Sequence, residues 1–175
     1  MPTIGVAIAV AEPYAAQLQR WRVSFGDAQA SSIPSHITLI PPTEVSGQLA
    51  RIQEHLEEVA RRHRAFPLRL RGTATFRPIS PVVFVSVTEG ISQCEMLAAD
   101  VRRGPLAREL PFPYHPHVTV AHHLEEAALD RAYVTLADFD CSFEVDAFHL
   151  YLHGEDAVWR PVSTFALQTP PTTTV

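Results

Sequence analysis

The sequence predicts a two-lobed protein of mixed helices and strands, built from an internal duplication. A phrase of the form His-apolar-Thr-apolar occurs twice, at residues 36–39 and 117–120, with its two histidines 81 residues apart. Of the nine histidines, only these two have a Ser or Thr two positions later. The order of predicted elements also begins again in the second half, because the first strand of each half starts at Ile4 and at Val82. A repeat of this length is too long for a solenoid and favours two lobes related by a pseudo-twofold axis.

The first half has the predicted order β-α-β-α-β. Short runs of apolar and β-branched residues indicate the strands, and Pro13 suits the first turn of the first helix. Pro41 and Pro42 are expected to stop the second strand, and Ser46 is expected to cap the second helix, whose apolar residues recur at helical spacing. The predicted segments are a strand at 4–10, a helix at 13–25, a strand at 36–40, a helix at 46–64 and a strand at 68–75.

The second half repeats this order and adds one strand. The predicted segments are a strand at 82–88, a helix at 92–103, a strand at 117–121, a helix at 125–137, one long strand at 143–152 and a last strand at 160–167. We therefore expect a single bilobal domain over residues 1–168, with lobes of about 1–76 and 77–168 between which strands can be exchanged. Residues 169–175 are expected to form a flexible tail.

Composition narrows the classes of function. All 14 basic residues are Arg, so the chain has no lysine for a Schiff base or a P-loop. The net charge of −5 argues against a protein that coats nucleic acid, although it is compatible with a small site for a nucleotide or an RNA end. Cys94 and Cys141 lack CxxC spacing and are predicted to be buried, reduced thiols. The apolar run at 4–10 is too short to span a membrane, so we expect a cytoplasmic protein without a membrane partner. We further expect a monomer with no protein partner.

The repeated phrase suits acid-base chemistry on a phosphodiester. Residues i and i+2 of a strand share a face, so each copy presents an imidazole beside a hydroxyl. One neutral histidine can take a proton from the attacking oxygen, while the other, protonated, gives a proton to the leaving oxygen. Thr38 and Thr119 can donate hydrogen bonds to the non-bridging oxygens, where charge accumulates in the transition state. His36 and His117 are therefore the predicted catalytic pair, with Thr38 and Thr119 as phosphate-binding residues and no metal or other cofactor.

In their contexts at residues 35–42 and 114–120, the paired motifs resemble those of the 2H phosphoesterase superfamily. This superfamily includes bacterial 2'-5' RNA ligase-like proteins and cyclic phosphodiesterases. The resemblance extends to residues 75–78 and 148–151 and so covers nearly the whole chain. It implies a bilobal α+β fold, with two antiparallel sheets around a central cleft and helices outside.

The resemblance also implies an activity. We expect a metal-independent phosphodiesterase that acts on 2',3'-cyclic or 2'-5'-linked nucleotide or RNA-end phosphodiesters, with the reverse 2'-5' ligation catalysed by the same groups. Substrate orientation decides which histidine is the acid, and we expect His36 in that role with His117 as the base.

Four further residues are expected to bind the substrate. Phe76 and Tyr114 can stack on a base, His115 adjoins the second motif, and Arg77 can supply positive charge. Many relatives in the RNA ligase group have an arginine shortly after the second motif, where this chain has residues 121–123 with the sequence Ala-His-His. A small nucleotide is therefore as good a candidate substrate as an RNA end.

Two other functions remain open. The chain could be a non-catalytic nucleotide- or RNA-end-binding module on the same fold, in which case binding survives the loss of either histidine. It could also be a metal-dependent hydrolase that uses the histidine cluster from His115 to His123, in which case chelators abolish the activity.

Overall fold

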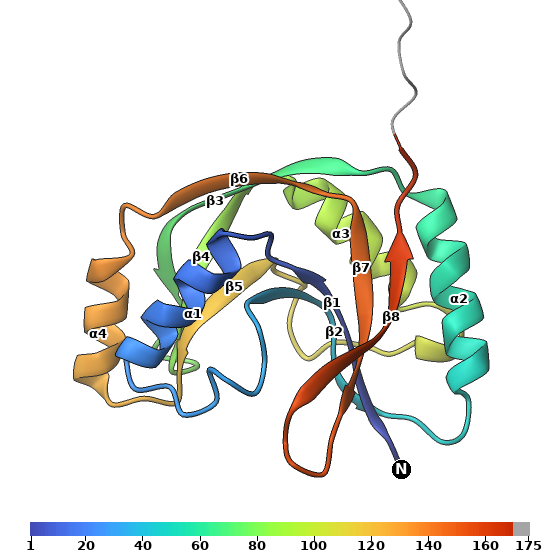
Figure 1. The fold of residues 1–175 in the computed structure, drawn as a ribbon, viewed down its shortest axis with the longest axis horizontal. Helices are drawn as coiled ribbons and strands as arrows, with labels where there is room; N and C mark the ends of the chain where they lie inside the picture. Colours follow the sequence, from blue (N-terminus) through green and yellow to red (C-terminus); the bar gives the residue numbers. More distant parts are fainter. Residues whose placement is uncertain (170–175) are drawn as a thin grey trace, which may run out of the picture.

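The computed structural model of the chain describes residues 1–169 and contains two four-stranded sheets (Figure 1). The first sheet has the strand order β2-β1-β7-β8 and the second has the order β5-β4-β3-β6, and all neighbouring strands are antiparallel. The strands are β1 Thr3–Ala9, β2 His36–Glu44, β3 Phe66–Thr75, β4 Val82–Glu89, β5 His117–His122, β6 Asp140–Val145, β7 Ala147–His153 and β8 Trp159–Ala166. The predicted α+β fold with two antiparallel sheets is thereby confirmed.

Four α-helices flank the sheets in the described residues, and α2 and α4 lie at opposite ends of the molecule (Figure 1). They are α1 Tyr14–Ser24, α2 Leu49–Arg62, α3 Ile91–Val101 and α4 Glu126–Thr135, with a short 3-10 helix at Gly104–Leu106. Helix α1, from the first half, packs against β5 of the second sheet, while α3, from the second half, packs against β2 of the first sheet. Each half of the chain therefore contributes a helix that packs against a sheet strand of the other half.

The strands are also exchanged between the two halves of the chain. Strand β3 belongs to the second sheet although it precedes residue 77, and β7 and β8 complete the first sheet although they come last in the chain. A cut near residue 76 would therefore not separate the two sheets. Of the predicted tail, residues 170–175 lie outside the described part of the chain.

The prediction of one long strand at 143–152 is wrong. Strand β6 ends at Val145, β7 begins at Ala147, and the two belong to different sheets. The buried positions change parity at this break, from odd numbers such as Cys141 and Val145 to even numbers such as Phe148. A strand keeps its alternation only while it stays in one sheet, so this change of phase marks the crossing point.

The two prolines do not stop the second strand, which is a further correction. Strand β2 continues through Pro41 and Pro42 to Glu44. It is an edge strand, and its register with β1 shifts on either side of Ile40. Proline is tolerated at edges and bulges because its missing N–H is not needed for pairing there.

Ser46 does not cap the second helix. Helix α2 begins at Leu49 after Gln48, and no side chain caps it. Gly47, with φ of +62°, turns the chain between Ser46 and the helix. The amphipathic pattern of α2 is as predicted, with one buried face formed by Ile52, Leu56, Val59 and Ala60.

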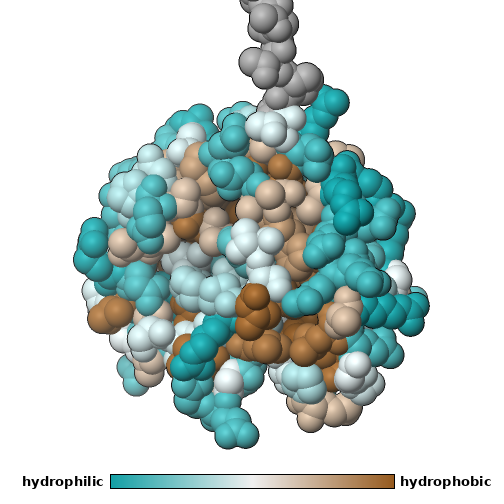
Figure 2. Space-filling view, turned by 45° about the vertical axis from the view of Figure 1, so that its right-hand side comes forward, coloured by the Kyte–Doolittle hydropathy of each residue, from teal (hydrophilic) through white to brown (hydrophobic). Residues whose placement is uncertain are grey.

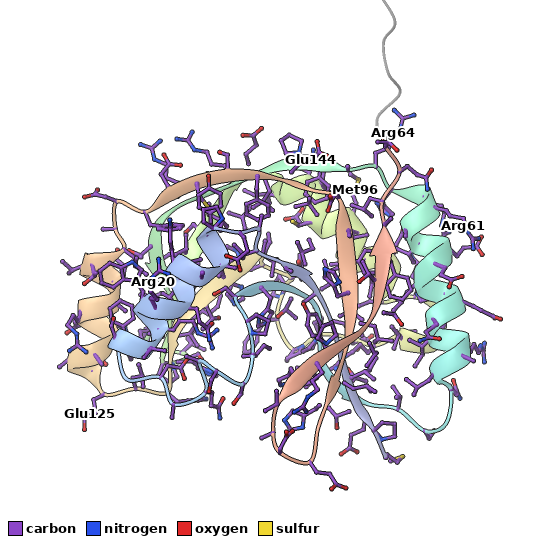
Figure 3. All side chains as sticks on the ribbon, in the orientation of Figure 1. Arg20, Arg61, Arg64, Met96, Glu125 and Glu144 are labelled. Carbon is purple, nitrogen blue, oxygen red and sulfur yellow. The ribbon has the colours of Figure 1, made fainter. Side chains whose placement is uncertain are left out.

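The surface separates into polar margins and a more apolar middle. Figure 2 shows one face in which hydrophobic residues gather toward the middle and lower part, with hydrophilic residues around them. Charged side chains such as Arg61, near the end of α2, point outward (Figure 3). Cys94 and Cys141 are both buried and unpaired, as predicted. Among residues 1–169, no helix has the length and apolar character needed to cross a membrane.

Candidate active site

The two repeated motifs lie on the edge strands of the two sheets, and these strands contact each other. In both motifs the apolar residues are buried, whereas the histidine and threonine are only partly buried. Strand alternation thus directs His36 and Thr38 of β2, and His117 and Thr119 of β5, away from the apolar interior. The structure brings all four predicted residues to the junction between the sheets.

A β-bulge occurs at the last residue of each motif. The register shift in β2 leaves Leu39 unpaired, since Thr38 and Ile40 oppose consecutive residues of β1. The register shift in β5 leaves Val120 unpaired in the same way. These two residues are separated by the same interval as the two histidines, so the duplication extends to the backbone geometry of the site.

Both catalytic candidates are held in the same tautomer. The Nδ1 atom of His36 lies 2.8 Å from the carbonyl oxygen of Pro34, and Nδ1 of His117 lies 2.7 Å from that of His115. A carbonyl oxygen can only accept a hydrogen bond, so each Nδ1 carries a proton and donates it. Each Nε2 is therefore left as the nitrogen that exchanges a proton with a ligand.

Burial lowers the pKa of both histidines from the ordinary imidazole value. The positive charges of Arg22 and His117 lower the pKa of His36 further, and the hydrogen bond to Pro34 partly offsets this. The ring of His117 lies against two phenyl rings, with centroids 5.0 Å from both Phe76 and Phe84. Burial therefore favours the neutral form of both imidazoles in the free protein, and an anionic ligand would favour their protonation.

Two cavities of similar volume flank the four residues, and Thr38 lines both. The first, which we call the loop-side cavity, has a volume of about 490 Å³. Its lining includes Arg22, residues 26–29, His36, Thr38, Thr119, His122 and His123. The second, which we call the aromatic cavity, has a volume of about 420 Å³. Its lining includes Thr38, Pro41, Phe76, Phe112, Tyr114, His115 and His117. A smaller cavity of about 80 Å³ is also lined by His36 and Thr38.

Three of the four expected substrate-binding residues lie in the aromatic cavity. Phe76, Tyr114 and His115 all line it, and the ring of His115 stacks on that of His117 at a centroid distance of 6.1 Å. Tyr114 also links the two motifs, because its hydroxyl donates a hydrogen bond of 2.8 Å to the carbonyl oxygen of Thr38. A planar group could therefore bind beside His117 without entering the loop-side cavity.

The fourth expected residue, Arg77, lies elsewhere. Its guanidinium donates to Asp130 at 2.7 Å and to Glu126 at 3.5 Å, both on α4. It lines neither cavity. Arg77 lies in the turn that follows β3, and its side chain is directed to α4 and not to the aromatic cavity that Phe76 lines.

Arg22 was missed by the sequence reasoning. Its side chain is buried, with Nε and Nη2 donating to Asp27 and Nη1 donating to the carbonyl oxygen of Ile33 at 2.7 Å. These bonds fasten α1 to the loop that leads into β2. Because its donors are already engaged, Arg22 acts on His36 through its charge. Asp27 follows five residues later, but residues five apart are not neighbours on a helix face, so this spacing does not predict an ion pair.

The histidine cluster proposed as a metal site is divided between the two cavities. His115 and His117 line the aromatic cavity, whereas His122 and His123 line the loop-side cavity. Within residues 1–169, no group of three or more His, Cys, Asp or Glu side chains is arranged to hold a metal ion. The metal-dependent alternative therefore has no ligand set in this part of the chain.

The sequence matches a known protein superfamily over most of its length. The model of the 2'-5' RNA ligase superfamily matches residues 10–157. The chain belongs to this superfamily. The resemblance seen in the two motifs is thereby confirmed, and both motifs lie within the matched region.

Two proteins with similar sequences are named as inferred phosphoesterases. The Bacillus cytotoxicus protein is 30% identical over 146 residues, which cover 81% of this chain and 83% of that protein. The Geobacillus protein is 30% identical over 142 residues, which cover 79% of this chain and 82% of that protein. The similarity thus spans both motifs and most of each relative.

Solved structures show the same fold at low identity. LigT of E. coli in its apo form has a TM-score of 0.71 at 22% identity, covering 96% of this chain and 99% of that chain. Usb1 of Kluyveromyces marxianus has a TM-score of 0.54 at 12% identity, covering 94% and 97%. The two-sheet architecture of the 2'-5' RNA ligase superfamily is therefore present over nearly the whole chain.

Proposed function

We propose that this superfamily member is a metal-independent phosphodiesterase that acts on 2',3'-cyclic or 2'-5'-linked nucleotide or RNA-end phosphodiesters. One observation carries the proposal. His36 and His117 each keep Nε2 free, and each has a threonine hydroxyl two residues away on the same strand face. The two pairs meet where the sheets join, so one phosphate can contact both.

The reaction follows from this arrangement. For a cyclic phosphate, the neutral imidazole takes a proton from water as the water oxygen bonds to phosphorus. The protonated imidazole gives its proton to the ribose oxygen as the bond from that oxygen to phosphorus breaks. Thr38 and Thr119 donate hydrogen bonds to the non-bridging oxygens. If the 5'-hydroxyl of a second RNA end attacks in place of water and the 3'-oxygen leaves, the same residues would form a 2'-5' bond, which is 2'-5' ligation.

The aromatic cavity suits the nucleobase. Phe76, Phe112 and Tyr114 line it, and aromatic faces stack on bases with little sequence preference. A nucleoside in this cavity has its ribose beside His117, and in that orientation His117 protonates the leaving oxygen while His36 activates water. This is the reverse of the assignment expected from the sequence. LigT of E. coli has been solved with 3'-AMP, NADP+ and ATP, which supports a nucleotide as the ligand class.

The proposal is tested by hydrolysis of 2',3'-cyclic nucleotides in EDTA. Turnover is expected in the wild type and should fall by about 10²–10⁴-fold in His36→Ala and in His117→Ala. The matched control is His63→Ala, because His63 pairs with Asp100 between α2 and α3 at 2.6 Å, away from the motifs. This control should keep its turnover per folded molecule.

Two outcomes would contradict the proposal. Nucleotide binding that is equal in the wild type and both variants, without turnover, would indicate a binding module. Turnover that requires added metal would indicate a metal-dependent hydrolase. The identity of the product, a 2'- or 3'-phosphate, would show which ribose oxygen leaves.

A further inference from the structure

The bulge in β5 turns an additional histidine toward the loop-side cavity. Val120 and Ala121 are both buried, so the alternation of β5 shifts by one residue after Thr119. His122 consequently projects on the same side as His117 and Thr119, and it lines the loop-side cavity. A bulge beside a functional site commonly re-aims a side chain in this way.

The next residue, His123, is held in place by an unusual backbone conformation. Its φ is +54°, in the left-handed region that residues other than glycine adopt infrequently. Its amide donates a hydrogen bond of 3.2 Å to the carbonyl oxygen of Pro81. The ring centroids of His122 and His123 are 3.7 Å apart, and both residues line the loop-side cavity.

The duplication provides an internal comparison. At the same interval as the two catalytic histidines, the residues equivalent to His122 and His123 are Pro41 and Pro42. After the bulges, β2 presents Pro41 to the aromatic cavity and Pro42 to the loop-side cavity, whereas β5 presents the imidazoles of His122 and His123 to the loop-side cavity. The two strands share a β-bulge but differ in the side chains that follow it, which are apolar prolines in β2 and imidazoles able to carry positive charge in β5.

We propose that His122 and His123 form a second anion subsite in the loop-side cavity, which binds a further phosphate group of the substrate. The inference rests on the proposed function, because it takes the scissile phosphate to lie between His36 and His117. The cavity has room for such a group beside that position, since its volume is about 490 Å³ and Thr119 lies in the same lining. The substrate class is therefore a nucleotide that carries at least one phosphate besides the scissile one.

The groups around the subsite make its affinity depend on pH. Burial and the neighbouring His123 lower the pKa of His122, and Asp27 raises it. Arg22 lines the same cavity, but its charge is paired with Asp27. On α4, the carboxylates of Glu126 and Asp130 are engaged by Arg77. The imidazole of His122 must therefore gain a proton to bind an anion well, and binding weakens as pH rises.

The test compares orthophosphate and pyrophosphate as probes by calorimetry in EDTA, at about pH 6 and about pH 8. In the wild type near pH 6, pyrophosphate should bind about tenfold more tightly than orthophosphate, since it places a second phosphate against charged donors. The ratio should fall toward one near pH 8. Both probes gain negative charge over this range, so a weaker affinity for pyrophosphate near pH 8 than near pH 6 can come only from the loss of positive charge by the protein.

The double variant His122→Gln/His123→Gln should bind both probes equally at both pH values and should keep the wild-type affinity for orthophosphate, which shows that it is folded. The control Arg61→Gln, which removes one exposed positive charge from α2, should keep the wild-type ratio. A double variant with the wild-type ratio would overturn the subsite. If the subsite is present but no phosphodiester is hydrolysed, the proposed function fails and the anion subsite stands.

Discussion

At the residue scale, each catalytic histidine is oriented by a hydrogen bond to a backbone group close to it in the sequence. Each catalytic histidine donates Nδ1–H to the carbonyl oxygen two residues earlier, from Pro34 and from His115. The carbonyl fixes both the ring orientation and the tautomer without any distant partner. Burial meanwhile lowers the pKa of each ring, which favours the neutral form of His36 and His117 in the absence of an anion.

This burial predicts how stability depends on pH. A histidine whose pKa is lower in the folded state binds fewer protons there than in the unfolded state. Stability is therefore complete above the ordinary imidazole pKa and is lost as pH falls through the folded pKa. We expect the melting temperature to fall between about pH 7 and about pH 5, and His36→Gln/His117→Gln should flatten this dependence. Equal slopes in the two proteins, measured by calorimetry, would contradict the assignment.

At the element scale, Arg22 joins α1 to the loop before β2. Its side chain is 6% exposed and that of Asp27 is 13% exposed, and their charged atoms lie 3.2 Å apart. The additional bond to the carbonyl oxygen of Ile33 places the loop just ahead of the first motif. The position of His36 therefore depends on a buried ion pair that is not part of the motif.

Removing Arg22 should affect both stability and His36. Arg22→Met leaves Asp27 largely buried and unpaired, and the expected cost is about 3 kcal/mol in the free energy of unfolding. The pKa of His36, followed by NMR, should rise because a nearby positive charge is lost. Asp27→Ala added to Arg22→Met should recover part of the stability but none of the pKa change. A pKa of His36 that does not respond would show that Arg22 has only a structural role.

At the scale of the whole molecule, the site exists because two edge strands meet. Neither sheet contains both motifs, and the helices cross between the halves, with α1 on β5 and α3 on β2. Tyr114 adds a direct link, since it comes from the loop before β5 and donates to the backbone of Thr38 in β2. The distance between the two histidines is thus set by the packing of one sheet against the other.

Tyr114→Phe should loosen this junction. Loss of one hydrogen bond to a partly buried carbonyl is expected to cost about 1 kcal/mol in the free energy of unfolding. The value of kcat/KM for a cyclic nucleotide should fall by more than the loss of folded protein explains, because the spacing of the motifs changes. The control is Tyr133→Phe, an exposed tyrosine on α4. Equal kcat/KM for the wild type and Tyr114→Phe would show that the link does not position the site.

The sequence by itself determined the two motifs, the order of the elements and the amphipathic face of α2, because periodicity and motif spacing are recorded locally along the chain. The apolar positions also change from odd to even numbers near Asp146 in the sequence itself, although a single long strand was predicted. Only the tertiary structure decided that β3 joins the second sheet and that β7 and β8 join the first, since strand pairing depends on contacts between distant segments. The same holds for the burial of Arg22, the pairing of Arg77 with α4 and the bulge that turns His122 toward the cavity. Each of these depends on which neighbour a residue meets after the chain has folded, and that neighbour lies on another element.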